Sequence, residues 1–168
     1  MSNIKVIHVD QNYFENNYRE LRENYVLSSL EVNKNLNRSD FEEHFINFGS
    51  FFHPIFGKKI FNNARIDTMI MLAATVDGKI VGLLIANNGF DNHCQLATLY
   101  VQTKYDKEKI GSSLLLKLEE LVVYDNIWVE VIGDDKIYKK NGYKKVDDNF
   151  YATLTRHRRY NCYAKKIK

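Results

Sequence analysis

The residue types that mark several large classes of protein are scarce in this chain of 168 residues. Two cysteines, Cys94 and Cys162, are too few for the disulfide framework of a small secreted domain, so we expect buried and reduced thiols. One proline and eight glycines exclude collagen-like and proline-rich sequences. The amino terminus lacks the apolar segment of a secretory signal, and no apolar run approaches the roughly 20 residues of a transmembrane helix. We therefore expect a cytoplasmic protein that does not enter a membrane.

Charge of one sign is also scarce, because 24 Lys and Arg residues face 21 Asp and Glu residues. The net charge of +3 is too weak to favour a nucleic-acid partner without a concentrated patch. One basic cluster occurs at residues 156–159, followed by Lys165, Lys166 and Lys168. We interpret it as a hairpin turn and a solvated tail, with contact to RNA or an acidic partner as the alternative. The five histidines show no metal-site spacing, so we expect no metal ion.

The overall composition is that of a globular protein. Hydrophobic residues make up 45% of the chain and charged residues 27%, which excludes a disordered chain. A chain of this length buries roughly 68–70% of the surface that its unfolded form exposes, which is enough for a core of its own. We therefore expect one domain over residues 1–168.

The middle of the chain has the clearest strand pattern. Residues 68–76 and 80–86 are apolar nearly throughout, and Asp77-Gly78 between them is typical of a tight hairpin turn. A third strand is expected over residues 94–101, after a turn at residues 89–92. Strands that are apolar on both faces must be covered on both faces, so we expect helices on each side of the sheet.

A helical period replaces the strand pattern after residue 101. The apolar residues that fall on one helical face are Ile110, Leu114, Leu115, Leu118, Leu121 and Val122. A strand, a helix and a further strand in this order fit a parallel crossover. The elements expected next are a strand over residues 127–132, a short helix over 134–140, and strands near 143–147 and 160–167.

The amino-terminal part is less regular. Residues 4–9 alternate like a strand, and Asp10 then stands where an N-cap would begin a helix. Ser39-Asp40 offers a second cap before aromatic residues at helical spacing. Together these patterns predict an α/β or α+β fold with a mixed sheet and helices on both faces.

The segment from Lys104 to Gly111 joins a buried strand to the start of a helix. A helix N-terminus presents unpaired N–H groups and a partial positive charge, which suit a pyrophosphate. Gly111 would let the backbone approach a ligand closely, and Ser112 and Ser113 add hydroxyl groups. Because every connection from a strand to a helix ends in this way, the segment alone favours a plain structural turn.

Three segments between Asp77 and Lys145 indicate a family. They are a strand ending Leu99-Tyr100-Val101, then Tyr105…Ile110-Gly111-Ser112-x-Leu114-Leu115, then Ile137-Tyr138-x-x-x-Gly142-Tyr143. With the hairpin before them, they resemble the GNAT superfamily of acetyl-coenzyme A-dependent N-acetyltransferases over the middle half of the chain. The resemblance implies a mixed, mostly antiparallel sheet flanked by helices, with acetyl-coenzyme A as cosubstrate. It also implies an acyltransferase that acetylates a primary amine of a small molecule, peptide or protein.

The resemblance implies roles for individual residues. The strands before and after the helix would splay apart around coenzyme A, and the backbone of Leu99, Tyr100 and Val101 would hold its acetyl and pantetheine end. Tyr138 would protonate the leaving thiolate, because a phenol with an ordinary pKa of about 10 matches a thiolate in basicity. The backbone amides that would hold the pyrophosphate belong to Lys107, Glu108, Lys109, Ile110, Gly111 and Ser112.

The chain departs from the family's glycine-rich motif at two positions. Asp106 replaces its Gln or Arg, and Lys109 replaces its central glycine. Carboxylates at Asp106 and Glu108 would repel a pyrophosphate by up to ~1 kcal/mol each, and Lys107 and Lys109 would offset this. A non-catalytic domain that kept the fold but has a weakened or lost coenzyme A site is therefore the alternative.

The sequence leaves the general base and the acceptor open. His93, Glu130 and Asp134 are candidate bases, because histidine is the usual base near neutral pH and Glu130 shares a strand face with Trp128. Acidic residues at 40–43 beside aromatic residues at 45–52 could form a mouth for a cationic amine or a solvated helix face over the core. Exposed aromatic side chains would also serve a homodimer.

Overall fold

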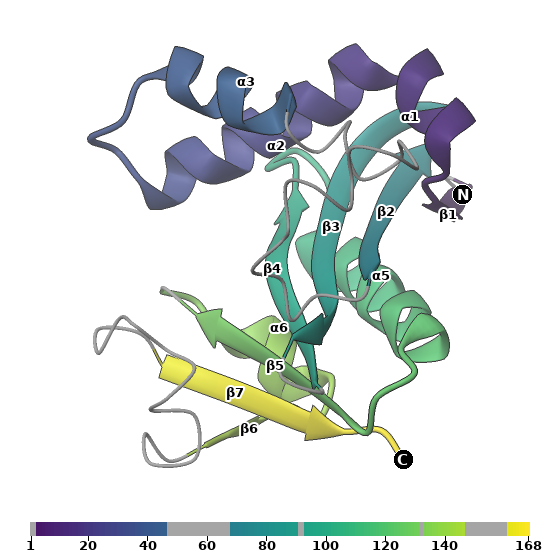
Figure 1. Ribbon diagram of the computed structural model, residues 1–168, viewed down its shortest axis with the longest axis vertical. Coiled ribbons are helices and arrows are strands. Elements are labelled where there is room, and N and C mark those ends of the chain that lie inside the picture. Colours follow the sequence, from purple (N-terminus) through teal and green to yellow (C-terminus); the bar gives the residue numbers. More distant parts are fainter. Residues whose placement is uncertain (1–2, 47–67, 91–92, 132, 147–160) are drawn as a thin grey trace.

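The structure is a computed structural model that describes residues 3–46, 68–90, 93–131, 133–146 and 161–168. It contains a seven-stranded sheet with helices on both faces (Figure 1). The strands are β1 (Ile4–His8), β2 (Thr68–Val76), β3 (Lys79–Phe90), β4 (His93–Val101), β5 (Asn126–Val131), β6 (Lys144–Lys145) and β7 (Asn161–Lys166). The helices are α1 (Gln11–Asn16), α2 (Tyr18–Val32), α3 (Arg38–Ile46), α5 (Lys107–Leu121) and α6 (Lys136–Lys140).

The order of the strands in the sheet is β1-β2-β3-β4-β5-β7-β6. Only β4 and β5 pair in parallel among the described strands, and the other neighbours are antiparallel. The helix between them, α5, makes the crossover that a parallel pair requires. The expectation of a mixed, mostly antiparallel sheet is therefore confirmed.

Two cores lie on opposite faces of the sheet, because alternate residues of a strand point in opposite directions. Met71 and Leu83 face the layer of α1, α2 and α3, whereas Leu72 and Leu84 face α5. This double burial explains why β2 and β3 are apolar at almost every position. Among the described residues, no helix is both long and apolar enough to span a membrane.

The turn between β2 and β3 has the predicted conformation. Asp77 has φ 51° and Gly78 has φ 80°, so both central residues are left-handed. The turn expected at residues 89–92 was placed too early, since β3 continues to Phe90. Asn88 still pairs with Cys94, and Gly89 is the extra residue of a β-bulge. Continued ladder pairing thus overrides the local turn preference of this stretch.

The helix starts follow their capping residues. Asp10 caps α1 as predicted, because its Oδ1 accepts a 2.7 Å hydrogen bond from the amide of Tyr13. The long amphipathic helix α5 begins at Lys107, three residues before Ile110, because Asp106 is its N-cap. The residues expected in a connecting loop therefore lie in the first turn of the helix.

The cap expected at Ser39-Asp40 was placed too late. Helix α3 begins at Arg38, so both residues lie in its first turn. The Asp40 carboxylate reaches back to accept a 3.0 Å hydrogen bond from the amide of Asn37. Such a contact is the second half of a capping box, in which an acidic side chain in the first turn accepts a hydrogen bond from the backbone amide of the residue before the helix.

A buried polar cluster attaches α2 to the sheet. Val81 is the extra residue of a bulge in β3, where Ile80 pairs with Thr75 and the following register shifts. The Ile80 amide donates to Glu20 Oε2 over 3.1 Å, and its carbonyl accepts from Gln102 Nε2 over 3.2 Å. Asn24, which is 1% exposed, accepts from the same Gln102 amide and extends its own toward the Ile80 carbonyl. These side chains fix the position of α2 over β3 and β4.

We predict that Asn24→Ala lowers the free energy of unfolding by about 1–3 kcal/mol, because it leaves buried polar groups of its neighbours without a partner. Urea unfolding followed by circular dichroism measures this loss. Asn16→Ala is the matched control, since Asn16 is an exposed helical asparagine whose amide also makes a hydrogen bond. Its effect should stay within about 0.5 kcal/mol. Equal losses in the two variants would contradict a special role for the buried cluster.

Candidate functional site

The neighbouring strands β4 and β5 part from one another in the middle of the sheet. Residues 94–96 pair with residues 127–129, and the described pairing between the two strands ends there. Ala97 is the extra residue of a β-bulge, because Leu96 and Thr98 face consecutive residues of β3. Beyond it β4 stays with β3 while β5 stays with β7, so a gap opens between them.

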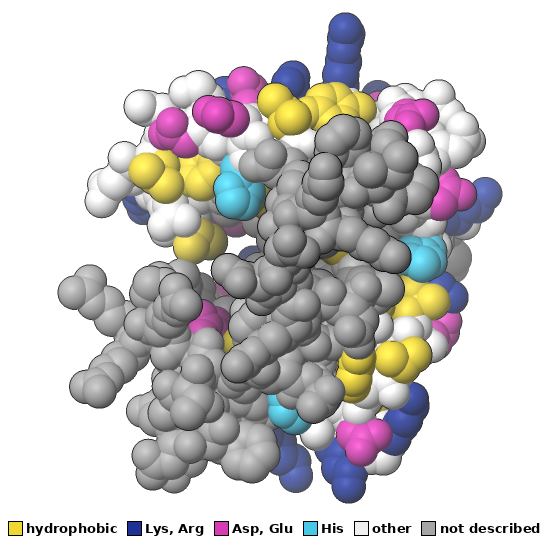
Figure 2. All heavy atoms as spheres, viewed as in Figure 1, with side chains coloured by type: hydrophobic (Ala, Val, Ile, Leu, Met, Phe, Trp, Pro, Cys, Tyr) yellow, Lys and Arg dark blue, Asp and Glu magenta, His cyan; other side chains and the backbone are white. Residues whose placement is uncertain are grey.

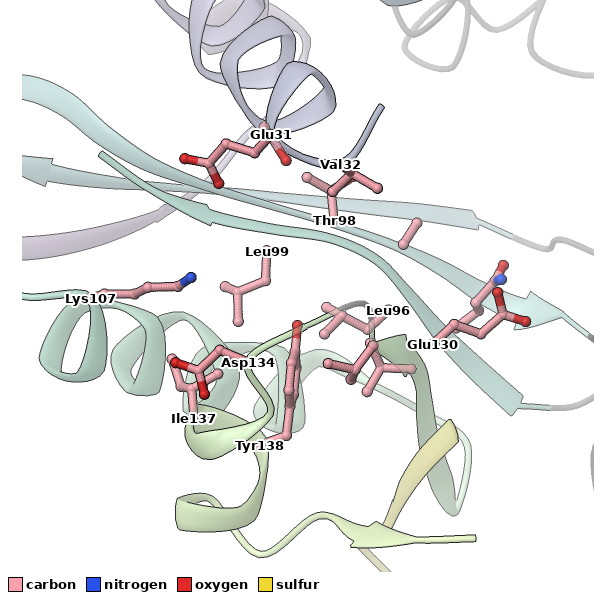
Figure 3. A pocket seen from close by; sticks show the side chains of 15 residues that line it. Glu31, Val32, Leu96, Thr98, Leu99, Lys107, Glu130, Asp134, Ile137 and Tyr138 are labelled. Carbon is pink, nitrogen blue, oxygen red and sulfur yellow. The ribbon is translucent and has the colours of Figure 1, made fainter. Parts of the chain in front are cut away.

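A cavity of about 340 Å³, called here the inter-strand cavity, occupies this gap. Figure 3 shows side chains that reach it from both sides of the sheet. Glu31 and Val32 of α2 line one end, whereas Ile137 and Tyr138 of α6 line the other. Because α2 packs on one face and α6 on the other, the cavity connects the two faces through the sheet.

Tyr138 extends from α6 toward the centre of the inter-strand cavity (Figure 3). Its side chain is 9% exposed, and its ring meets that of Tyr143 edge to face with centroids 5.9 Å apart. In the described part of the chain its hydroxyl has no hydrogen-bond partner. Burial raises the pKa of Tyr138 well above its usual value of about 10, so the group keeps its proton at neutral pH. It therefore carries a proton that it could give to a group in the cavity, but burial makes it a weaker acid than the ordinary phenol assumed from the sequence.

Contacts with β7 hold α6 in place. Asp135, which precedes α6, accepts a hydrogen bond from the Tyr163 hydroxyl and forms a 2.8 Å ion pair with Lys139. Hydrogen bonds from Lys139 and Tyr163 lower the pKa of Asp135, so its carboxylate stays ionised. The carbonyl of Tyr138 accepts from the amide of Tyr143 over 3.0 Å. The orientation of Tyr138 thus depends on this network as well as on packing.

The start of α5 borders the same cavity. Asp106 Oδ1 accepts the amide of Lys109 over 2.9 Å, and the Asp106 carbonyl accepts the amide of Ile110 over 3.0 Å. Two amides expected to face a pyrophosphate are thereby engaged within the protein. Lys109 has a helical backbone conformation, so the side chain that replaces the family's glycine causes no strain there. Lys107 lines the cavity with its ammonium group directed inward (Figure 3).

The other residues of this first turn contact α6. A Cβ on Gly111 would lie 2.2 Å from Ile137 Cδ1, so the space in front of Gly111 is filled by that side chain. Ser112 Oγ accepts from Asn141 Nδ2 over 2.9 Å, and Glu108 pairs with Lys140 over 2.6 Å. The sequence reasoning assigned the glycine to close approach by a ligand, whereas here it permits close packing of α5 on α6.

Among the predicted cosubstrate residues of β4, Leu99 lines the cavity. The side chains of Tyr100 and Val101 are buried, and their Cα partners lie in β3. Ile110 is buried in the core between α5 and the sheet.

The candidate bases are placed differently. Glu130 lines the cavity from β5, and Asp134 lines it from the turn before α6 (Figure 3). His93 is the first residue of β4 and does not belong to the lining of the inter-strand cavity. The two candidates at the cavity therefore remain in reach of a reacting group there.

The acidic, aromatic mouth expected near residues 40–52 falls only partly within the described structure. Asp40 caps α3, and Glu42 forms a 2.9 Å ion pair with Arg38. Phe45 is buried in the core beneath α2 and α3. The aromatic residues at 48–52 and the basic cluster at 156–159 lie outside the described residues.

The sequence reasoning missed three residues of α2 that line the cavity. They are Ser28, Glu31 and Val32, whose i, i+3, i+4 spacing places them on one face of the helix. That spacing is visible in the sequence. It identifies a site only when it is known which strands and helices lie opposite this face of the helix, and the sequence does not show that.

The cysteines are buried, as expected, and burial raises the pKa of Cys94 to about 12. Such a thiol is protonated at neutral pH and is a poor nucleophile. No group of three or more His, Cys, Asp or Glu side chains suited to a metal ion occurs in the described ranges.

Comparison with known proteins gives one family. The family model for an acetyltransferase (GNAT) domain matches residues 20–164. A GNAT-family acetyltransferase from Staphylococcus aureus Mu50 is 21% identical with a TM-score of 0.68, over 99% of this chain and 100% of that one. No curated protein sequence matches the chain.

Two further solved structures share the fold. The PaiA N-acetyltransferase from Thermoplasma acidophilum, in complex with coenzyme A, is 19% identical with a TM-score of 0.64, over 98% of this chain and 99% of that one. An aminoglycoside 6'-acetyltransferase of type Ii is 19% identical with a TM-score of 0.65, over 98% of this chain and 97% of that one. At these identities the likeness concerns the fold.

We predict that Tyr143→Phe leaves the free energy of unfolding unchanged or raises it. The Tyr143 hydroxyl is buried and makes no hydrogen bond to the described residues, so its removal relieves a desolvation penalty. Urea unfolding gives the comparison with the unmodified protein. A loss above about 1 kcal/mol would show that the hydroxyl has a partner that stabilises the fold.

Proposed function

The chain belongs to the GNAT acetyltransferase family, and from that premise we propose that it acetylates a primary amine, with Tyr138 as general acid. The acceptor is a small molecule or a terminus or side chain of a peptide or protein. One observation carries the proposal: the inter-strand cavity joins the two faces of the sheet, and the Tyr138 side chain extends into it. Two substrates that enter from opposite faces would meet beside this hydroxyl.

The side of the cavity formed by α5 and α6 suits acetyl-coenzyme A. Leu99 and Ile137 offer apolar contact to the pantetheine arm, and the ammonium of Lys107 offers a charge to its phosphates. The first amides of α5 outside the Asp106 cap belong to Lys107 and Glu108, and they add the positive end of the helix. The proposed phosphate binding therefore depends more on a side-chain cation than it would in a glycine-rich loop, where backbone amides hold the phosphates.

The proton transfers follow from this arrangement. Acetyl-coenzyme A supplies the acetyl group as a thioester, so a carbon–sulfur bond breaks as a carbon–nitrogen bond forms. Tyr138 donates its proton to the departing sulfur and regains one from solvent. The attacking amine loses its extra proton to water or to a carboxylate, and Glu130 and Asp134 are the better placed candidates because both line the cavity. His93 is the weaker candidate.

The network at Asp135 supports this role of Tyr138. An acid must lie within hydrogen-bond reach of the sulfur, so its helix has to stay fixed during the reaction. Asp135 and Tyr163 join α6 to β7, and Gly111 allows α5 to pack closely on α6. The proton donor is thus positioned by two neighbouring elements.

A second candidate function is a non-catalytic binding domain of the same fold. The hydrogen bond from the Lys109 amide to Asp106 favours it, because that amide is engaged inside the protein. Binding and turnover measurements separate the two functions.

The extent of the domain follows from the packing. We propose that residues 1–168 form one domain, because the cores on both faces share β2 and β3. The cytoplasmic location and a homodimer stay predictions from the sequence.

We predict that acetyl-coenzyme A at 100 times its dissociation constant raises the melting temperature by about 5–11 °C. Binding to the folded state alone contributes ~2.7 kcal/mol at that ratio, and ~2–4 °C accompany each kcal/mol for a chain of this size. Differential scanning fluorimetry measures the shift. No shift at millimolar ligand, together with a shift in Lys109→Gly, would favour the non-catalytic domain.

We predict that Tyr138→Phe lowers kcat about 100-fold and changes cosubstrate affinity little, since it removes the proton donor but keeps the ring. Tyr143→Phe is the matched control, because it removes a hydroxyl from the adjacent buried ring and should keep kcat within about threefold. Steady-state kinetics with saturating acetyl-coenzyme A tests both variants. A near-normal rate in Tyr138→Phe would mean that water or another group protonates the sulfur.

A further inference from the structure

The end of the inter-strand cavity at α2 lies across the sheet from the side proposed above for the cosubstrate. Ser28, Glu31 and Val32 form this end and lie on one face of the helix. Figure 3 shows Glu31 and Val32 on α2, across the sheet from Tyr138. If acetyl-coenzyme A enters from the side of α5 and α6, as proposed above, then the acceptor amine approaches along this opposite end.

Glu31 is exposed, and it differs from Glu23 and Glu42 in its charged neighbours. Glu23 is paired with Arg38, and Glu42 with the same arginine. Glu31 has no ion pair with any described residue, although it lines the cavity. A carboxylate without a cation beside a substrate path is available to bind a positively charged group.

The charged residues differ between the elements at the two ends of the cavity, although Asp134 also lines the end at α6. Figure 2 shows acidic and basic side chains interspersed over the upper part of the molecule, where α2 and α3 lie. Lysines are concentrated instead on α6, β6 and β7: Lys136, Lys139, Lys140, Lys144, Lys145, Lys165 and Lys166. Lys139, Lys140 and Lys165 are paired with carboxylates, so the charge that favours a cationic acceptor at the α2 end is that of Glu31 itself.

The neighbours of Glu31 suit an alkyl chain. Val32 is 49% exposed and offers apolar surface one residue away, and Ser28 adds a hydroxyl one turn earlier. At the other end of the path, Tyr138 is 9% exposed and its hydroxyl makes no hydrogen bond within the described structure. The path thus runs from a polar group that lacks a partner, along apolar surface, to a carboxylate.

We propose that Glu31 binds a second ammonium group of the acceptor, so that the preferred substrates are aliphatic diamines and polyamines. One amine of the chain lies near Tyr138 and is acetylated, while the distal ammonium pairs with the Glu31 carboxylate. This inference rests on the proposed acetyltransfer. Glu31 acts in binding and leaves the chemical step unchanged, so its loss raises KM for diamines and leaves kcat nearly constant.

The experiment compares amines that differ in the second charge alone. Initial rates with saturating acetyl-coenzyme A are measured for 1,4-diaminobutane and 1-aminobutane, then for diaminoalkanes of three to eight carbons. The unmodified protein should prefer one or two diamine lengths in kcat/KM. Glu31→Gln should lower kcat/KM for those diamines about threefold to tenfold and leave the monoamine unchanged.

Glu15→Gln is the matched control, since it removes the same charge from an exposed helical position outside the cavity. It should keep the diamine preference, and loss of the preference there would show a general effect of charge. Equal rates for monoamine and diamine, unchanged in Glu31→Gln, would overturn the inference and leave acetyltransfer intact.

A binding measurement separates this inference from the reaction. Isothermal titration of 1,4-diaminobutane, and of the best diamine length, into the protein with coenzyme A needs no turnover. Binding that weakens in Glu31→Gln supports the acceptor site, and in the absence of acetylation it would count against the proposed function alone. Binding that is absent, or equal in both proteins, overturns the inference.

Discussion

The loss of pairing between β4 and β5 is the constraint on which the rest of the site depends. Parallel ladder pairing ends after residues 96 and 129, where the bulge at Ala97 keeps β4 with β3. Main-chain groups that face such a gap lack a neighbouring strand and are ready to bind a ligand. The gap also connects the two faces of the sheet, so the cavity is lined by helices from both of them.

A gap in the middle of a sheet requires rigid walls. On one side the buried cluster of Glu20, Asn24 and Gln102 holds α2 against the start of β3. On the other side Asp135 and Tyr163 hold α6 against β7. Both attachments are polar contacts that fix orientation, whereas the apolar cores supply most of the stability. The result places a buried tyrosine hydroxyl and a carboxylate at opposite ends of one cavity.

Part of this arrangement could be predicted from the sequence because its signals are local. The Asp77-Gly78 turn, the apolar strands and the helix after β4 depend on neighbours within a few residues, and all three are found. The importance of Tyr138 came from a motif, and the structure brings this side chain into the cavity. Asp106 was interpreted as a repulsive charge, whereas it caps α5, because the start of the helix was placed three residues too late.

The sequence by itself determined the class of fold, the family and the segment that contains Tyr138, since periodicity, turn chemistry and motifs act over short stretches of chain. Only the tertiary structure decided that Glu31 of α2 shares a cavity with Tyr138 of α6, and that Gly111 faces Ile137 instead of open space. Residues separated by about a hundred positions meet there through sheet order, a bulge and the packing of two helices. These are long-range properties, and no local pattern of residues encodes them.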